Sequence, residues 1–318
     1  MSLAPYVTGV LRLIVVPAGL AWVFIHAPQL GWAQQVSLHP LWLVAALILN
    51  QIALFLFSVR LRLILGLWSV RLGWMASFRI HLQSMFYFIV VPMTVGLEIA
   101  RYIKIKALDP SVSKTGLAAA LLVDRIVGAL SALVLALLCL PLLRFTVAPP
   151  LATPWLLAVL AALLVGLAAA VIWGRWRRQV GDAWRFTFGR RKVLVGIFVL
   201  SMIMHVVFAL CIQTAAMGLG TPVTFTDVLF AVSGGMLFLA VPVSLAGIGP
   251  ADAGAAALLV LLGHAVSDAV VVGALPYLAR LIAAIEGGLW EFADGGRAAF
   301  AAARGHGDSE AAAPAAER

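Results

Sequence analysis

Charged residues are scarce in this sequence. Asp, Glu, Lys and Arg make up 11% of its 318 residues, against about 25% in soluble domains, while 64% are hydrophobic. This composition excludes an ordinary soluble domain. Acidic residues are the scarcer kind, 13 against 22 Lys and Arg, and the formal net charge is +9. We attribute this excess to basic loops on one side of a membrane rather than to nucleic-acid binding.

Cysteine is also nearly absent. The two residues present, Cys139 and Cys211, both lie in apolar runs, so a disulfide framework is not expected. No spacing of Cys, His, Asp or Glu indicates a metal site, and no complete nucleotide-binding motif occurs. We therefore expect no metal, no cofactor and no nucleic-acid partner.

Long apolar runs are what the sequence has instead. A spanning helix needs about 20 apolar residues. Residues 13–59 contain no Asp, Glu, Lys or Arg, which leaves room for two such helices around a polar loop at 28–40. Four further spans are expected at 116–143, 154–174, 193–217 and 269–290. Two other apolar segments, 80–97 and 228–266, are interrupted by proline and glycine, the second also by the pair Gly234-Gly235.

Basic clusters determine the predicted topology, because Lys and Arg are enriched in cytoplasmic loops. If every run crossed the membrane once, the clusters at 60–79 and 101–114 would lie on opposite sides. Treating 80–97 and 228–266 as re-entrant hairpins removes this conflict and places both termini in the cytoplasm. The sequence therefore predicts an all-α, multi-pass protein of the bacterial inner membrane. It would have six transmembrane helices and two re-entrant broken-helix hairpins.

The two hairpins resemble each other. The segment VVPMTVGLE at 90–98 matches AVPVSLAGIGPAD at 240–252, since each has a proline, a glycine four or five residues later, and then an acid. We therefore divide a membrane domain (1–292) into two inverted repeats, 1–143 and 154–292, an architecture typical of transporters. Residues 293–318 are rich in Ala, Gly and charge, and are expected to form a disordered cytoplasmic tail.

Five residues are expected to break the hairpin helices: Pro92, Gly96, Pro242, Gly247 and Gly249. Proline removes a backbone donor and glycine permits unusual dihedral angles. Unwound backbone inside a membrane is tolerated where it is buried in protein or lines a wet cavity. The simpler alternative is a kink in an otherwise continuous helix.

Two arginines lie deep within predicted spans. Arg125 is nine residues into its span, roughly 13 Å at the rise of an α-helix, and Arg280 is at a similar depth from the other side. A charge at the bilayer centre costs roughly 2.5–3.5 kcal/mol, so both are expected to face the bundle interior. Two guanidinium groups suit a phosphate, since each donates hydrogen bonds in pairs. The alternative is structural ion pairing with nearby acids: Glu98, Asp124, Asp252 or Glu286.

Other polar residues carry weaker signals. His81 and His205 lie in apolar runs, where hydrogen-bonded interior histidines are more common than proton relays. The basic loop at 175–192 is expected to rest on anionic headgroups, or else to dock a partner protein.

These motifs resemble a known family. VVPMTVGLEIARYIKIKAL with LAAALLVDRIVGAL, and VPVSLAGIGPADAGAAALLVLLG with LPYLARLIAAIEGGLWE, resemble paired signatures of the lysylphosphatidylglycerol synthase transmembrane region, also called flippase-like. The likeness covers residues 11–291. It implies lipid synthesis or lipid transfer between leaflets, and similar stand-alone members are linked to hopanoid and polyprenyl-glycolipid pathways.

The resemblance also implies which residues carry function. It adds Glu98, Arg101, Asp252 and their helix breakers to the two deep arginines, and we include Asp124 as the neighbour of Arg125. Family members often have an Arg-Glu pair after the GIG turn, whereas this sequence has Ala251-Asp252, which puts the usual substrate in doubt. A soluble aminoacyl-transferase domain is also missing, so we do not expect the synthase itself.

The sequence thus predicts a lipid flippase that binds an anionic phospholipid or glycolipid between two repeats. Arg125 and Arg280 would hold the phosphate, and the acids would orient them or couple protons. One alternative is an enzyme, or an accessory subunit, of lipid modification such as hopanoid or glycolipid biosynthesis, with Asp124 or Glu98 as acid or base. Another is a scaffold that recruits a cytoplasmic or membrane enzyme partner through the loop at 175–192.

Overall fold

A computed structural model describes residues 38–90, 96–143, 190–238 and 249–311, with side chains to residue 295, and every regular element in these ranges is a helix. Four helices are long and apolar enough to cross a membrane: α2 (Pro40–Leu67), α5 (Lys114–Cys139, continued by the 3-10 turn Leu140–Leu142), α8 (Arg191–Gly218) and α11 (Val266–Ala311) up to Gly295. They confirm the all-α membrane class and four of the six expected spans. The first helix within 13–59 and the span at 154–174 lie outside the described residues.

The ends of α2 follow from its sequence. Pro40 stands in the first helical turn, where a backbone N–H would have no acceptor within the helix, so its absence in proline costs no hydrogen bond. The helix continues eight residues beyond the expected end at Val59, so that Arg60 and Arg62 are helical rather than part of a loop. The chain then turns through Ser69, whose φ of 64° lies in the left-handed region.

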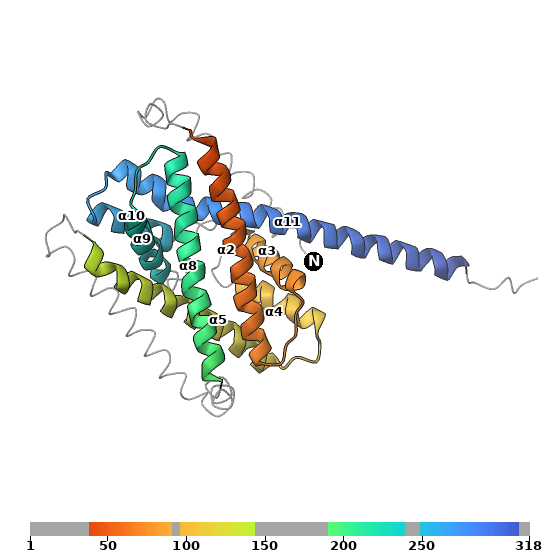
Figure 1. Ribbon diagram of the computed structural model, residues 1–318. Coiled ribbons are helices and arrows are strands. Elements are labelled where there is room, and N and C mark those ends of the chain that lie inside the picture. The colour runs from red at the N-terminus through yellow and green to blue at the C-terminus, as the bar shows by residue number, and fades with distance from the viewer. Residues whose placement is uncertain (1–37, 91–95, 144–189, 239–248, 312–318) are drawn as a thin grey trace, which may run out of the picture.

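Two pairs of short helices lie at the predicted hairpins. The first pair is α3 (Trp74–Val90) and α4 (Gly96–Leu108), and the second is α9 (Phe225–Leu237) and α10 (Pro250–Leu261). The first pair extends beyond the expected segment 80–97 at both ends, so that Arg101 and Lys104 are helical rather than part of a basic loop. At 1.5 Å per residue, the longest is about 26 Å, less than the hydrocarbon core of a bilayer. In Figure 1 α9 and α10 lie to the left of α8, and α3 and α4 lie to the right of α2, so the two pairs flank the α2–α8 pair.

The predicted breakers lie where these helices stop or restart. Gly96 is the first residue of α4, and Gly249 is the N-cap of α10. Pro92, Pro242 and Gly247 fall between the paired helices, outside the described residues.

The prediction that Gly234-Gly235 interrupts a helix is wrong. Both residues lie within α9 and are buried. A Cβ at Gly235 would be 2.6 Å from the carbonyl oxygen of Ala251, and one at Gly234 would be 2.6 Å from a methyl carbon of Leu258. The glycines therefore allow α9 and α10 to pack closely, and they do not end the helix.

The interior is divided into two main apolar clusters. One lies among α5, α8, α9, α10 and α11, with Val228, Ala231 and Ala269 fully buried at its centre. The other joins α2 and α5 to the first hairpin, with Leu61 and Leu117 fully buried. Helices α2 and α8 run side by side along the molecule (Figure 1). Each hairpin thus has a separate core.

Helix α11 contacts both hairpins. Near its start, Gly273 lies against α10, so closely that a Cβ would be 2.7 Å from that of Ala256. Further on, Glu291 pairs with Lys104 of α4 (2.6 Å), and Asp294 pairs with Arg79 of α3. The same helix therefore holds the second hairpin and the first.

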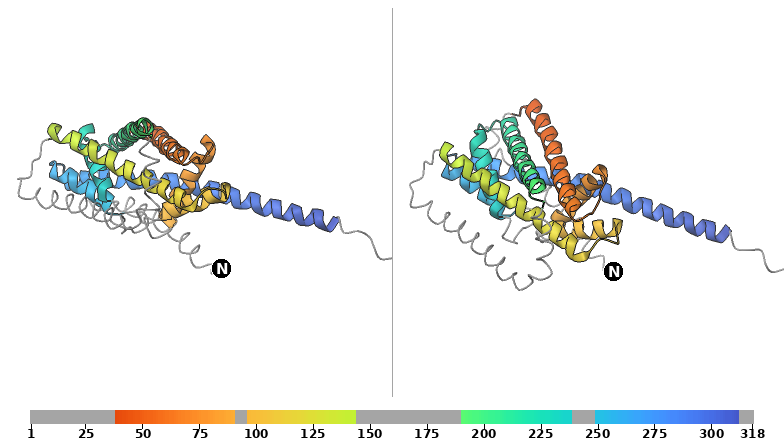
Figure 2. Two further views of the ribbon diagram at one scale, coloured as in Figure 1. Left: turned by 90° about the horizontal axis from the view of Figure 1, so that it is seen from below. Right: turned by 60° about the horizontal axis from the view of Figure 1, so that its bottom comes forward.

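The tail expected to be disordered from residue 293 is helical as far as Ala311. Figure 2 shows this part of α11 extending away from the other helices in both views. The composition misled the prediction, because low hydropathy was taken for disorder although alanine, frequent in this stretch, has the highest helix propensity of all residues.

Candidate functional site

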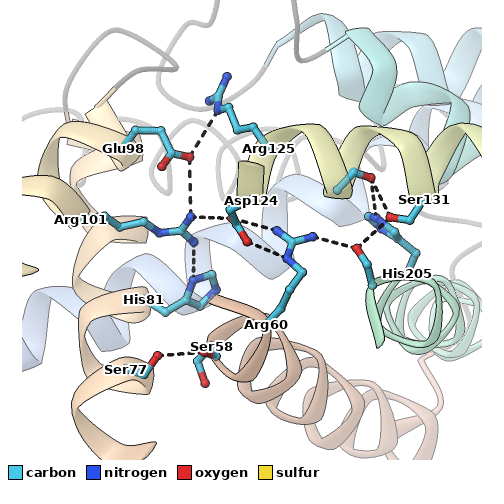
Figure 3. A network of polar contacts seen from close by, with 12 residues as sticks. Ser58, Arg60, Ser77, His81, Glu98, Arg101, Asp124, Arg125, Ser131 and His205 are labelled. Atoms are coloured by element: carbon cyan, nitrogen blue, oxygen red, sulfur yellow. Dashed lines mark hydrogen bonds and ion pairs between the residues drawn. The ribbon is translucent and has the colours of Figure 1, made fainter. Parts of the chain in front are cut away.

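One buried carboxylate binds two guanidinium groups at the centre of the first half. Asp124 of α5 accepts two hydrogen bonds from Arg60 of α2, from Nε to Oδ1 at 2.8 Å and from Nη2 to Oδ2 at 3.0 Å. Arg101 of α4 donates to the same Oδ2 from Nη1 at 3.2 Å. The three side chains are 3–7% exposed. Figure 3 shows Asp124 between the two arginines.

A second carboxylate extends this cluster toward its edge. Glu98, in the first turn of α4, lies 3.6 Å from Nη1 of Arg101 and accepts a hydrogen bond from Nε of Arg125 at 3.3 Å. Arg125 lies on the far side of Glu98 from Arg101 in Figure 3, and its side chain is 44% exposed. Arg125 thus occupies the exposed edge of the cluster.

The cluster has more positive than negative charge. Arg60, Arg101 and Arg125 contribute three positive charges, whereas Asp124 and Glu98 contribute two negative ones, which leaves one positive charge in excess among these residues. We call these five residues the arginine cluster. Buried charges inside a membrane protein require partners, and Asp124 and Glu98 supply them to these arginines.

Neutral polar groups hold the buried arginines in place. His81 of α3 is fully buried, and its Nδ1 lies 2.7 Å from Nη2 of Arg101. Because a guanidinium can only donate, Nδ1 must accept, which places the ring proton on Nε2 of a neutral imidazole. On the other side, Nη1 of Arg60 donates to the hydroxyl of Ser201 (2.9 Å), which is bonded to Ser131 (2.8 Å).

Both histidines fit the expected role of interior, hydrogen-bonded residues. The His81 ring stacks on Phe57 at 5.6 Å between centroids. Nε2 of His205 lies 3.2 Å from the carbonyl oxygen of Gly128.

The second half contains a smaller site. Nη2 of Arg280, on α11, donates to both oxygens of Asp252, at 2.6 and 2.7 Å. Asp252 stands in the first turn of α10, and its Oδ2 also accepts the backbone N–H of Gly249 at 3.1 Å. Their side chains are 7% and 17% exposed for the acid and the arginine, respectively.

The two halves repeat one arrangement. In each, an acid in the first turn of the second hairpin helix pairs with an arginine of the following long helix. The sequence separation is 27 residues for Glu98 and Arg125, and 28 for Asp252 and Arg280. The contacts differ in detail, since Nε of Arg125 donates to one oxygen of Glu98 whereas Nη2 of Arg280 donates to both oxygens of Asp252.

All six predicted binding residues therefore lie in ion pairs, four in the arginine cluster and two in the second half. Such ion pairs are what the structural alternative predicts. Glu286, which that alternative also named, accepts a hydrogen bond from Gln51 instead. Sequence analysis missed Arg60, because it follows directly after a long uncharged run and was read as the start of a loop. Its burial could have been suspected from the periodicity of a helix that continues to Leu67.

No group of three or more His, Cys, Asp or Glu side chains in the described residues could hold a metal ion. The guanidinium groups of the arginine cluster are donors that can form hydrogen bonds and charge pairs with a phosphate or carboxylate.

Comparison with known proteins gives one match. Residues 9–285 match the model of a family described as the lysylphosphatidylglycerol synthase TM region. No curated protein and no solved structure shows significant similarity to the chain.

Proposed function

The chain belongs to the lysylphosphatidylglycerol synthase TM region family, and on that premise we propose that it binds an anionic lipid headgroup inside the bundle and helps the lipid to change leaflets. The observation that carries this proposal is the gathering of three guanidinium groups from α2, α4 and α5 around Asp124 and Glu98. A lipid phosphate or phosphodiester offers negative charge and paired acceptors to guanidinium donors.

A purely structural role accounts poorly for the cluster. Replacing a buried ion pair with well-packed apolar residues is often neutral or stabilising, so a stable bundle does not require such charges. Five charged side chains from three helices, with unequal numbers of each sign, are a costly way to join helices inside a membrane. Binding an anion explains why three arginines gather there.

The position of the cluster also suits a lipid headgroup. Glu98 and Arg101 lie at the start of α4, where unpaired backbone N–H groups and the helix dipole favour negative charge. Arg125 lies at the edge of the cluster with 44% of its side chain exposed, where an entering headgroup reaches it first. From there the headgroup reaches Arg101 by competing with Glu98.

Lipid movement in proteoliposomes tests the proposal. Purified protein is reconstituted with fluorescent phosphatidylglycerol or, as a neutral reference, fluorescent phosphatidylcholine, and dithionite quenching reports how much label reaches the inner leaflet. We expect the wild type to move the anionic lipid faster than empty liposomes, and Arg125→Gln to lose most of this movement.

Arg62→Gln is the matched control. Arg62 lies on α2 like Arg60, but its Nε donates to the carbonyl oxygen of Leu72 and its guanidinium stacks on Trp74 at 3.9 Å, outside the arginine cluster. We expect its transport to equal that of the wild type. Normal movement by Arg125→Gln, or a lipid recovered in chemically altered form, would overturn the proposal. The second result would support the enzyme alternative.

A further inference from the structure

We propose a second lipid site, a pocket between α3 and α11 that binds the hydroxyl end of an uncharged lipid alcohol. The pocket has a volume of about 380 Å³, and its lining comes from Phe78 and Leu82 of α3 and from Glu286, Leu289 and Trp290 of α11. This volume lies within the usual range of small-molecule sites, about 300–1,000 Å³. The pocket shares no lining residue with the arginine cluster, and the inference does not rest on the proposed function.

The pocket lies at a surface that faces acyl chains. Its lining residue Leu289 is 68% exposed, and Ile285 on the same helix is a further large apolar residue at the surface. Phe55 of α2 is exposed as well, and its ring packs on that of Phe78 at 6.1 Å between centroids. Because α2 and α11 are long and apolar enough to cross a membrane, these side chains meet lipid, and an occupant enters the pocket from the bilayer.

One acid stands among the apolar groups of this pocket. Oε1 of Glu286 accepts a hydrogen bond from Nε2 of Gln51 on α2, and Glu286 has no other hydrogen bond or ion pair with the described residues. Arg79 stacks on Trp290 at 4.9 Å, but it is already paired with Asp294. An ionisable group within a membrane span is costly without a partner, so the second oxygen of Glu286 is left for a ligand.

A hydroxyl group suits this carboxyl better than a charged group does. The ionised acid would repel a phosphate, and an ammonium would lose its hydration among apolar side chains. A hydroxyl donates to an ionised carboxylate and accepts from a protonated one, so it fits Glu286 in either state. The four apolar lining residues then surround the hydrocarbon next to the hydroxyl, which makes an uncharged lipid alcohol the matching ligand.

Binding of matched lipids to the full chain in detergent, followed by native mass spectrometry, tests this assignment. The probe is dioleoylglycerol, and its methyl ether has the same chains without the free hydroxyl. We expect the alcohol to bind about tenfold or more tightly than the ether, since it alone donates a hydrogen bond to a carboxylate. Phosphatidylglycerol should not displace it, and the ammonium lipid 1,2-dioleoyl-3-dimethylammonium-propane should bind more weakly.

Variants then locate the site. Leu289→Trp fills the pocket from an exposed position and should weaken binding of dioleoylglycerol about tenfold or more. Ile285→Trp is the matched control, because it adds the same side chain to an exposed position of α11 that does not line the pocket. We expect it to bind like the wild type. The double variant Gln51→Leu, Glu286→Leu removes both polar groups together and should bind the alcohol and its ether equally.

Three results would overturn the proposal. Equal binding of the alcohol and its ether by the wild type would exclude recognition of the hydroxyl. Tighter binding of the ammonium lipid, or displacement of dioleoylglycerol by phosphatidylglycerol, would assign the pocket to a charged lipid. Equal binding by Leu289→Trp and Ile285→Trp, with both variants unfolding thermally like the wild type, would place the bound alcohol outside the pocket.

Discussion

Asp124 is the residue on which the buried charges most depend. Its carboxylate accepts three of the hydrogen bonds that join α2, α4 and α5, two from Arg60 and one from Arg101, and it is almost fully buried. Asp124→Asn keeps the shape but removes the charge and turns one acceptor into a donor. Two buried guanidinium groups would then face an amide that cannot neutralise them.

The expected loss of stability is large. Removing one partner of a buried ion pair costs about 3–5 kcal/mol, because the remaining charge stays desolvated and unpaired. Even the lower value reduces the ratio of folded to unfolded protein more than about 100-fold. Arg60→Gln should cost a similar amount. The double variant should lose less than the sum of the two, by about 0.5–3 kcal/mol, since neither charge is then left alone.

Unfolding by sodium dodecyl sulfate in mixed micelles measures this directly. The ten tryptophans provide a fluorescence signal, and far-UV circular dichroism reports the loss of helix. Asp109→Asn is the control, because Asp109 is confined to an exposed turn with Ser111, and it should unfold like the wild type. The reasoning is refuted if Asp124→Asn is as stable as the wild type, or if the effects of the two single variants simply add.

Three further predictions concern helix packing. Gly287→Ala should destabilise the fold strongly, because its Cβ would lie 1.9 Å from the backbone oxygen of Leu82 and would force α11 away from α3. We expect a lower yield of monodisperse protein in size-exclusion chromatography. Gly295→Ala, with no atom within 4 Å of its Cβ, should behave like the wild type in that experiment, and a matching loss would refute the packing argument. Gly128→Ala should reduce lipid movement more than stability, since its Cβ would lie 2.9 Å from Nη1 of Arg60, a side chain that can shift; unchanged transport would contradict this.

Much of the fold could be predicted from composition and hydropathy alone. Uncharged runs identify α2, α5, α8 and α11, because the bilayer imposes a minimum length on any apolar helix. The pairing of Glu98 with Arg125 was among the alternatives, since both stood out as charges in apolar surroundings.

What the sequence could not predict depends on contacts between distant segments. Arg60 pairs with Asp124 across 64 residues, whereas Arg62, two positions further along α2, donates to the carbonyl oxygen of Leu72 in the turn before α3. Glycine can end a helix or let two helices approach closely, and the sequence around Gly235 fits both roles. The close contact with Ala251 of α10 decides for the second role. Such choices are made by tertiary packing and not by propensity.

Helix α11 is bound at two points along its length, one to each hairpin. Arg280 and Glu291 are eleven residues apart, about 16 Å along the helix axis, and hold different hairpins. A rigid helix that is held at two points cannot tilt at one of them without moving the element bound at the other. Tilting α11 about the midpoint between these two contacts would therefore push one hairpin inward as it draws the other outward, so that a displacement at either hairpin would be transmitted to the other.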